Sequence, residues 1–287
     1  MSAILDREEY IEQAYAFRSY RERLESNVPA QEILATIGEE VLTTTKLPLA
    51  LSFLKGEILL TGKVSDGMKR LSHYFTPFQS YIMARAEEER SRFDQKTALL
   101  ILERQAQYMA ANPIPAGLFV FQFECVARNR LGYHLGMKAI AEDPLYDSNW
   151  HDWILKTRNR LGSTDFADLI YYRSEHYVNE RKRRTRKGRE KPSFPILFGV
   201  DEGRIAKANR GKDPLFMFSA LQRHLGHPAV PRARPAASAP PIHPALEQRL
   251  QRIEAKLKIM ESEIKDEFDL SEFYIKPEDI GRDGDDG

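Results

Sequence analysis

The sequence contains a single cysteine, Cys125, so no disulfide can form within the chain. Small secreted domains depend on disulfides, whereas a chain of 287 residues can bury a hydrophobic core without them. We therefore expect a reducing environment and a cytoplasmic location. Residues 1–9 turn acidic before any apolar run begins, so we expect no secretion signal.

Long apolar runs and catalytic motifs are missing as well. The apolar stretches 47–54 and 117–121 fall far short of the roughly 20 residues that cross a bilayer, and we expect no membrane partner. Phosphate-binding loops, dinucleotide fingerprints, nucleophile elbows, zinc-protease patterns and CxxC pairs do not occur in the sequence. We expect no cofactor and no metal, and we favour a non-catalytic protein. The alternative is a helical enzyme whose active-site residues come together only in the tertiary structure.

The balanced total charge of +1 hides a segregation of charge along the chain. Residues 1–180 carry 21 basic and 25 acidic side chains, and residues 181–234 carry 15 and 4. Residues 245–287 are acidic again, with 7 basic and 13 acidic side chains. Such segregation indicates an anionic partner for the middle segment, or contact between the charged segments themselves.

Apolar residues return every three or four positions through residues 1–180, which predicts an all-α, multi-helix bundle. We expect long helices over 6–25, 76–109 and 163–177, and a capping box formed by Asp6 and Glu9 at the start of the first one.

The segment 117–131 is apolar on nearly every face, which is typical of a helix in the centre of a bundle. Its core side chains should be Leu118, Phe119, Val120, Phe121, Phe123, Cys125 and Val126. Further along, residues 194–208 contain the turn sequence Asp201-Glu202-Gly203, and we expect a small β-hairpin there.

Two charged residues, Glu124 and Arg173, lie on apolar helix faces. An unpaired buried charge costs several kcal/mol, so each should have a partner. Arg128 lies one turn beyond Glu124, and Arg173 should contact a carboxylate from another helix, of which Glu124 is one candidate. We favour buried salt bridges over the alternative, a pocket carboxylate with a raised pKa.

Composition divides the chain into a helical body over 1–226, a Pro/Ala-rich linker over 227–244, a coiled-coil segment over 245–266 and an acidic, disordered tail over 267–287. The coiled-coil seam is spaced 4, 3, 4, 3, 4 and consists of Leu246, Leu250, Ile253, Leu257, Met260 and Ile264.

Charges beside the seam fit a parallel partner, because Arg249 then faces Glu254 and Lys256 faces Glu261 of a second copy. We expect a homo-oligomer, and the sequence does not fix the number of copies. The alternative is an amphipathic helix that packs on its own body. On this basis we expect a self-associating scaffold or adaptor.

The first alternative function is binding of nucleic acid or another polyanion through a basic segment at 181–191. Phe194 and Phe198 lie close by and could stack on bases. The segment could instead contact an acidic protein or the acidic tail, or be solvated. Its basic residues are Arg181, Lys182, Arg183, Arg184, Arg186, Lys187, Arg189 and Lys191.

Overall fold

The structure is a computed structural model, and its described residues all belong to a unit within 1–233. They form thirteen α-helices and one short 3-10 helix, with no strand among them. The prediction of an all-α, multi-helix body is therefore confirmed. The described ranges are 4–26, 28–88, 93–184 and 192–232.

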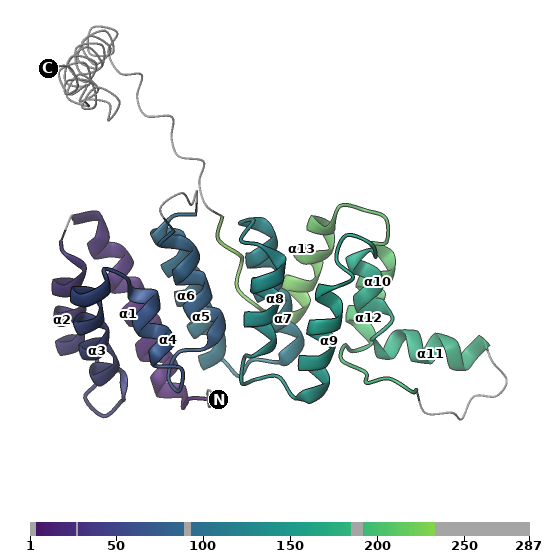
Figure 1. Cartoon of the computed structure of the whole chain (residues 1–287). Coiled ribbons are helices and arrows are strands. Elements are labelled where there is room, and N and C mark those ends of the chain that lie inside the picture. Colours follow the sequence, from purple (N-terminus) through teal and green to yellow (C-terminus); the bar gives the residue numbers. More distant parts are fainter. Residues whose placement is uncertain (1–3, 27, 89–92, 185–191, 233–287) are drawn as a thin grey trace, which may run out of the picture. The chain divides into compact units, whose positions relative to one another are not determined.

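Six helices make up the N-terminal half of this unit (Figure 1). The first and the last of them pack along each other, and Glu103 of the last is paired with Arg18 and Arg21 of the first. The six helices are α1 (Arg7–Arg23), α2 (Ala30–Glu40), α3 (Leu47–Thr61), α4 (Val64–Arg70), α5 (Pro77–Ala86) and α6 (Gln95–Ala110).

The expected single helix over 76–109 is wrong, since α5 and α6 are separate helices. Two carboxylates bind backbone N–H groups on either side of the break. Glu87 accepts hydrogen bonds from the amides of Val64 and Ser65, which begin α4. Asp94 accepts from the amide and the hydroxyl of Thr97 and so caps α6.

The expected capping box at the start of α1 is also wrong, because the Asp6 side chain makes no capping hydrogen bond. Glu9 is buried and bridges distant segments instead. Its carboxylate accepts from the amide of Lys46 at 2.7 Å and from the hydroxyl of Tyr74 at 2.7 Å. Glu9 therefore makes tertiary hydrogen bonds in place of the capping hydrogen bond that the local sequence pattern predicts.

Seven helices make up the C-terminal half, and α7 lies at its centre, with the seven core side chains predicted for it all buried. α7 packs against α8 and α13. The seven helices are α7 (Pro115–Arg128), α8 (Tyr133–Ala141), α9 (Ser148–Arg158), α10 (Phe166–Tyr171), α11 (Glu175–Arg184), α12 (Val200–Ala208) and α13 (Pro214–Leu225).

The expected hairpin over 194–208 is wrong, because its second half is the helix α12. Asp201 and Glu202 lie in the first turn of α12, where acidic side chains stabilise a helix N-terminus. A Cβ on Gly203 would lie 2.2 Å from the Ser174 hydroxyl, so only glycine lets α12 approach the turn before α11 this closely. The first half runs as an extended segment whose Phe198 forms an isolated bridge with Ser174.

The expected helix over 163–177 is divided into α10 and α11 at Tyr172–Ser174. The Ser174 hydroxyl accepts from the amide of Tyr177 in the first turn of α11, and the amides of Leu197 and Phe198 donate to the carbonyl of Arg173. Because these contacts compete with helical hydrogen bonds, the chain turns here and α11 takes a new direction.

Residues 227–232, where we expect the linker to begin, lie against the body. The side chain of Asn129 donates to the carbonyl of Pro231 at 3.0 Å, and Arg104 donates to the carbonyl of Ala229. His227 is buried beside the ring of Phe121. The described part of the body therefore extends beyond residue 226.

Candidate polyanion interface

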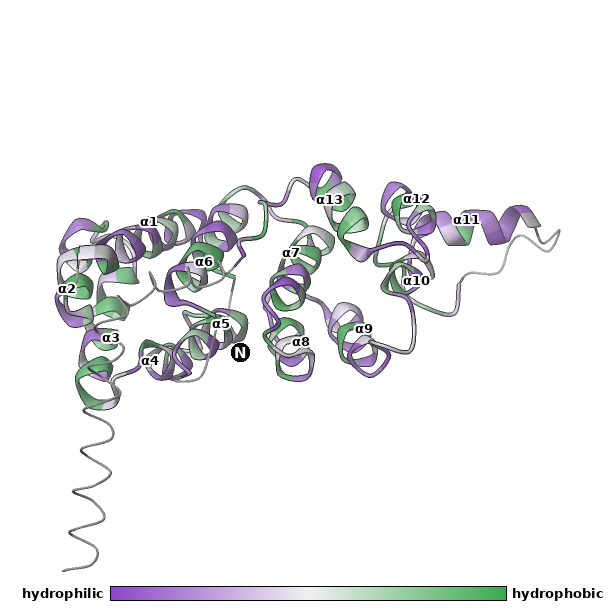
Figure 2. Cartoon of the chain, turned by 90° about the horizontal axis from the view of Figure 1, so that it is seen from above, coloured by the Kyte–Doolittle hydropathy of each residue, from purple (hydrophilic) through white to green (hydrophobic). Residues whose placement is uncertain are grey.

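α11 begins in the body and ends outside it. Figures 1 and 2 both show its C-terminal end extending beyond α10 and α12, and Figure 2 shows that most of the helix is hydrophilic. The basic segment predicted at 181–191 starts on this end. The structure therefore places its first residues on a projecting helix.

The N-terminal half of α11 is fixed by the carboxylate of Glu180. Lys207 of α12 donates to it, the hydroxyl of Tyr171 donates at 2.6 Å, and His176 Nε2 lies 3.4 Å away. The bond from Lys207 and then that from Tyr171 lower the pKa of Glu180 to about 2. Glu180 is thus engaged within the body and does not pair with the cations that follow it on α11.

Three cations near the end of α11 differ from Glu180 in this respect. Arg181, Lys182 and Arg183 are exposed, and none of them is in an ion pair with a described residue. Burial of Arg173 and then the nearby charge of Arg160 lower the pKa of Arg173, so Arg160 adds to the positive field here. Glu175 is the exposed carboxylate on the same helix. This end of the unit therefore presents a local excess of positive charge.

Aromatic rings lie on the turn before α11, on its first turn and on the segment after it. The rings of Tyr172 and Tyr177 are 5.1 Å apart and perpendicular, and Phe194 lies 6.1 Å from Tyr177. The guanidinium of Arg173 lies 5.1 Å above the ring of Phe194. We call these residues together the aromatic–basic surface: Tyr172, Arg173, Tyr177, Arg181, Lys182, Arg183 and Phe194.

The two phenylalanines that we expected beside the basic segment have different environments. Phe194 is half-buried and belongs to the aromatic–basic surface. Phe198 is 2% exposed and packs on Trp150, Trp153 and Phe119, so it is a core residue and cannot stack on a base. The sequence could not separate the two, because both are followed by small or apolar residues.

The two charges expected on apolar faces are not brought together. Glu124 is 3% exposed and its carboxylate pairs with Arg128 on the next turn of α7. Burial nevertheless raises the pKa of Glu124. Arg173 is half-buried, and the expected carboxylate partner is wrong as far as the described residues go: its guanidinium contacts the ring of Phe194 instead.

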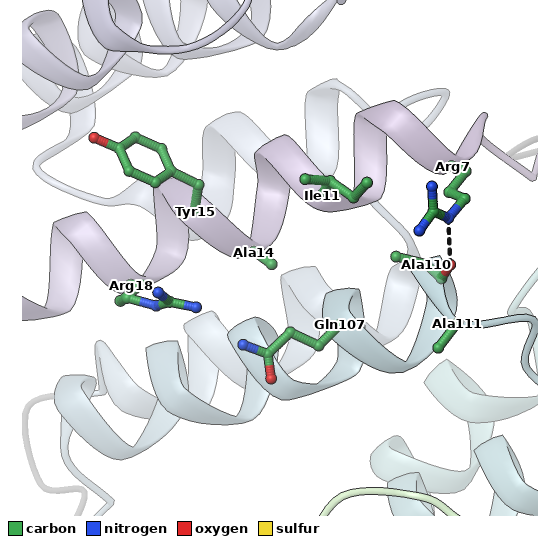
Figure 3. Close-up of a pocket in the computed structure, with 8 residues that line it drawn as sticks. All are labelled: Arg7, Ile11, Ala14, Tyr15, Arg18, Gln107, Ala110 and Ala111. Atoms are coloured by element: carbon green, nitrogen blue, oxygen red, sulfur yellow. Dashed lines mark hydrogen bonds between the residues drawn. The ribbon is translucent and has the colours of Figure 1, made fainter.

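A second surface feature is an open groove of about 360 Å³ between α1 and α6 (Figure 3). Its cations are already engaged, since Arg7 donates to the carbonyl of Ala110 and Arg18 pairs with Glu103. Its other two polar side chains are also engaged, since Tyr15 donates to Glu40 and Gln107 donates to Glu103. It is lined by Arg7, Ile11, Ala14, Tyr15, Arg18, Gln107, Ala110 and Ala111.

Several predicted site residues lie outside the described residues, and for these the predictions stay predictions. They are Arg186, Lys187, Arg189 and Lys191 of the basic segment, together with the seam and its charge pairs within 245–266. Within the described ranges, no group of three His, Cys, Asp or Glu side chains could hold a metal ion. No helix in those ranges is long and apolar enough to cross a membrane.

Sequence reasoning missed Tyr172 and Tyr177 as surface residues, because it placed both positions within one core-packed helix. The signal that could have found them is the run Tyr171-Tyr172-Arg173 shortly before the basic segment. No protein-family model matches the chain, and no curated protein or solved structure matches it either.

Proposed function

We propose that this protein is non-catalytic and binds an anionic polymer, with nucleic acid as the first candidate, through the end of α11. The observation that carries the proposal is the set of exposed cations Arg181, Lys182 and Arg183, which lack an ion-pair partner among the described residues. Because Lys207 neutralises Glu180, that carboxylate does not offset their charge.

The expected binding is electrostatic and insensitive to base sequence. A cation that neutralises a phosphate releases condensed counterions, so affinity falls with salt in proportion to the number of contacts. Three contacts predict a loss of about 20- to 40-fold between 50 and 200 mM salt. Nothing among the described residues suggests readout of base identity.

Mobility shifts of the full chain with RNA and DNA at these two salt concentrations test the proposal. The triple variant Arg181→Glu, Lys182→Glu and Arg183→Glu should abolish the shift. A matched control reverses Lys46, Lys55 and Lys63, three exposed lysines on or beside α3, and should leave the shift unchanged. Equal shifts for both triple variants would overturn the assignment to α11, and absence of any shift would overturn the function.

The acidic tail over 267–287 is the competing ligand for the same cations. If it occupies them, a chain truncated after Pro240 should bind nucleic acid more tightly than the full chain. Affinity that does not change on truncation would argue against contact between the tail and α11.

Self-association through the seam over 246–264 is the second candidate function, and the heptad spacing with its paired charges supports it. Light scattering on the full chain and on the chain truncated after Pro240 measures it directly. The scaffold function predicts an oligomer that becomes a monomer on truncation, and equal monomer masses would overturn it.

A further inference from the structure

The aromatic–basic surface contains rings that the fold does not use as core. Tyr172 is 46% exposed, and Tyr177 and Phe194 are half-buried. The hydroxyls of Tyr172 and Tyr177 donate no hydrogen bond to a described residue. By contrast, the neighbouring Tyr171 is 5% exposed and binds Glu180. The exposed rings therefore require a different explanation from Tyr171.

The surroundings of these rings favour a planar, anionic ligand. The guanidinium of Arg173 lies 5.1 Å from the ring of Phe194. Arg210, whose charge is paired with Asp168, lies 5.3 Å from the ring of Tyr172. Guanidinium groups and aromatic rings both present flat faces on which a nucleobase can stack. The surface thus combines stacking groups with positive charge.

Helical geometry connects the rings to the cations. Tyr177 and Arg181 are four residues apart on α11, so they lie on one face of the helix, one turn from each other. Tyr172 and Phe194 contribute rings at the N-terminal end of that face. A strand whose base stacks on Tyr172 or Tyr177 would therefore have its next phosphates near Arg181.

We propose that the ligand of the aromatic–basic surface is single-stranded nucleic acid, with bases stacked on the exposed rings and phosphates held by the cations of α11. This inference rests on the proposed function and specifies its ligand. In a duplex the base faces are already covered by their neighbours, so exposed rings would gain nothing from it. Another polyanion, such as heparin, has no bases to stack.

Fluorescence anisotropy of the full chain separates these ligands. The probes are a labelled single strand of about ten uridines, a duplex of equal total charge and heparin as competitor. One stacked base contributes about 1–3 kcal/mol, so we expect the single strand to bind at least about 5-fold more tightly than the duplex. Tyr172→Ala should weaken single-strand binding about 10-fold and leave duplex binding unchanged, whereas Tyr172→Phe should bind like the native chain.

Tyr133 on α8 provides the matched control, because it is also 46% exposed and carries the same ring outside the aromatic–basic surface. Tyr133→Ala should leave single-strand affinity unchanged. A variant that fails to fold would show altered thermal unfolding. Photocrosslinking of a 4-thiouridine strand to the native chain then gives an independent readout, with adducts expected at Tyr172, Tyr177 or Phe194.

Each outcome has a distinct consequence. Equal affinity for single strand and duplex, with Tyr172→Ala unchanged or adducts confined to other segments, would overturn the single-strand inference and leave polyanion binding intact. Preference for the duplex would indicate that α11 binds a groove or backbone without the rings. No binding of any probe at 50 mM salt would overturn the proposed function and the inference together.

Discussion

The two halves of the described unit share one hydrophobic core but differ in the contacts that accompany it. In the helices α1–α6, buried carboxylates accept hydrogen bonds from distant backbone amides or pair with arginines, as Glu9, Glu57 and Glu103 do. In the helices α7–α13, packed rings form the centre. The ring of Phe119 lies within 6.3 Å of five others, which are Phe123, Trp150, Trp153, Phe166 and Phe198.

The two kinds of contact depend on different properties of their side chains. A carboxylate that receives a particular backbone N–H fixes one loop in one position, and its contribution depends on charge. Ring packing contributes mainly through buried area and shape, so it tolerates changes of charge but not of volume. The N-terminal half should therefore be sensitive to carboxylate substitutions, and the C-terminal half to loss of ring volume.

The largest effect is expected from Phe119→Ala. The side chain is fully buried at the centre of the rings, and its removal leaves a cavity that α7 and α9 cannot close. We expect a loss of about 4 kcal/mol in the free energy of unfolding, measured by urea denaturation. Phe216→Ala on α13, where the ring is 65% exposed, should change stability by less than about 0.5 kcal/mol. A loss below 1 kcal/mol for Phe119→Ala would show that the rings do not hold this half together.

The core of α7 was the part of the fold that the sequence predicted most directly. The apolar run over 117–126 identified the core of α7 directly, because nearly every position is buried. In the N-terminal half, the sequence predicted the helix over 6–25, but it joined α5 and α6 into one helix and gave Glu9 the wrong role. Glu9 matched a local capping pattern yet binds Lys46, 37 residues away, and no periodicity carries that information. The sequence pattern of a helix predicts which of its residues are buried. It does not predict which distant group a buried carboxylate binds.

The aromatic–basic surface shows the same limit. The basic segment is evident in the sequence as a run of cations. The positions of Tyr172 and Tyr177, by contrast, depend on the break between α10 and α11. That break follows from the contacts of Ser174 with Tyr177, Phe198 and Gly203, which come from three separate segments. Because one continuous helix was expected over 163–177, neither Tyr172 nor Tyr177 was predicted to lie at the surface.

One buried carboxylate in the aromatic half, that of Asp143, is in no ion pair with a described cation. Asp143 is 2% exposed and accepts from the Gln122 amide at 3.0 Å and from the backbone of Leu145. Burial raises its pKa from 3.8 to about 6. The folded protein thus holds this proton more tightly than the unfolded chain, so its contribution is complete below pH 4 and is lost as pH rises through 6.

We expect this loss to be about 3 kcal/mol across that range, since each pKa unit corresponds to 1.36 kcal/mol. Other groups titrate in the same window, so the measurement is the difference between the native chain and Asp143→Asn in urea denaturation at pH 4, 5, 6 and 7.5. The native chain should lose stability relative to the variant as pH rises. A difference that is constant with pH would show that Asp143 is ionised in the folded state and that the two halves treat carboxylates alike.

The smallest of the three effects is expected from Glu9→Gln, which removes the charge while keeping the shape. A glutamine retains one acceptor oxygen, but its amide group then faces either the Lys46 amide or the Tyr74 hydroxyl. Hydrogen bonds to a charged group contribute about 1.5–3 kcal/mol, so we expect a loss of about 2 kcal/mol at pH 7. Glu8→Gln changes the exposed neighbouring carboxylate and should cost less than about 0.5 kcal/mol. Both variants could instead unfold at the same urea concentration as the native chain. The buried Glu9 carboxylate would then not stabilise the segment before α3, and the two halves would differ in residue composition but not in what stabilises them.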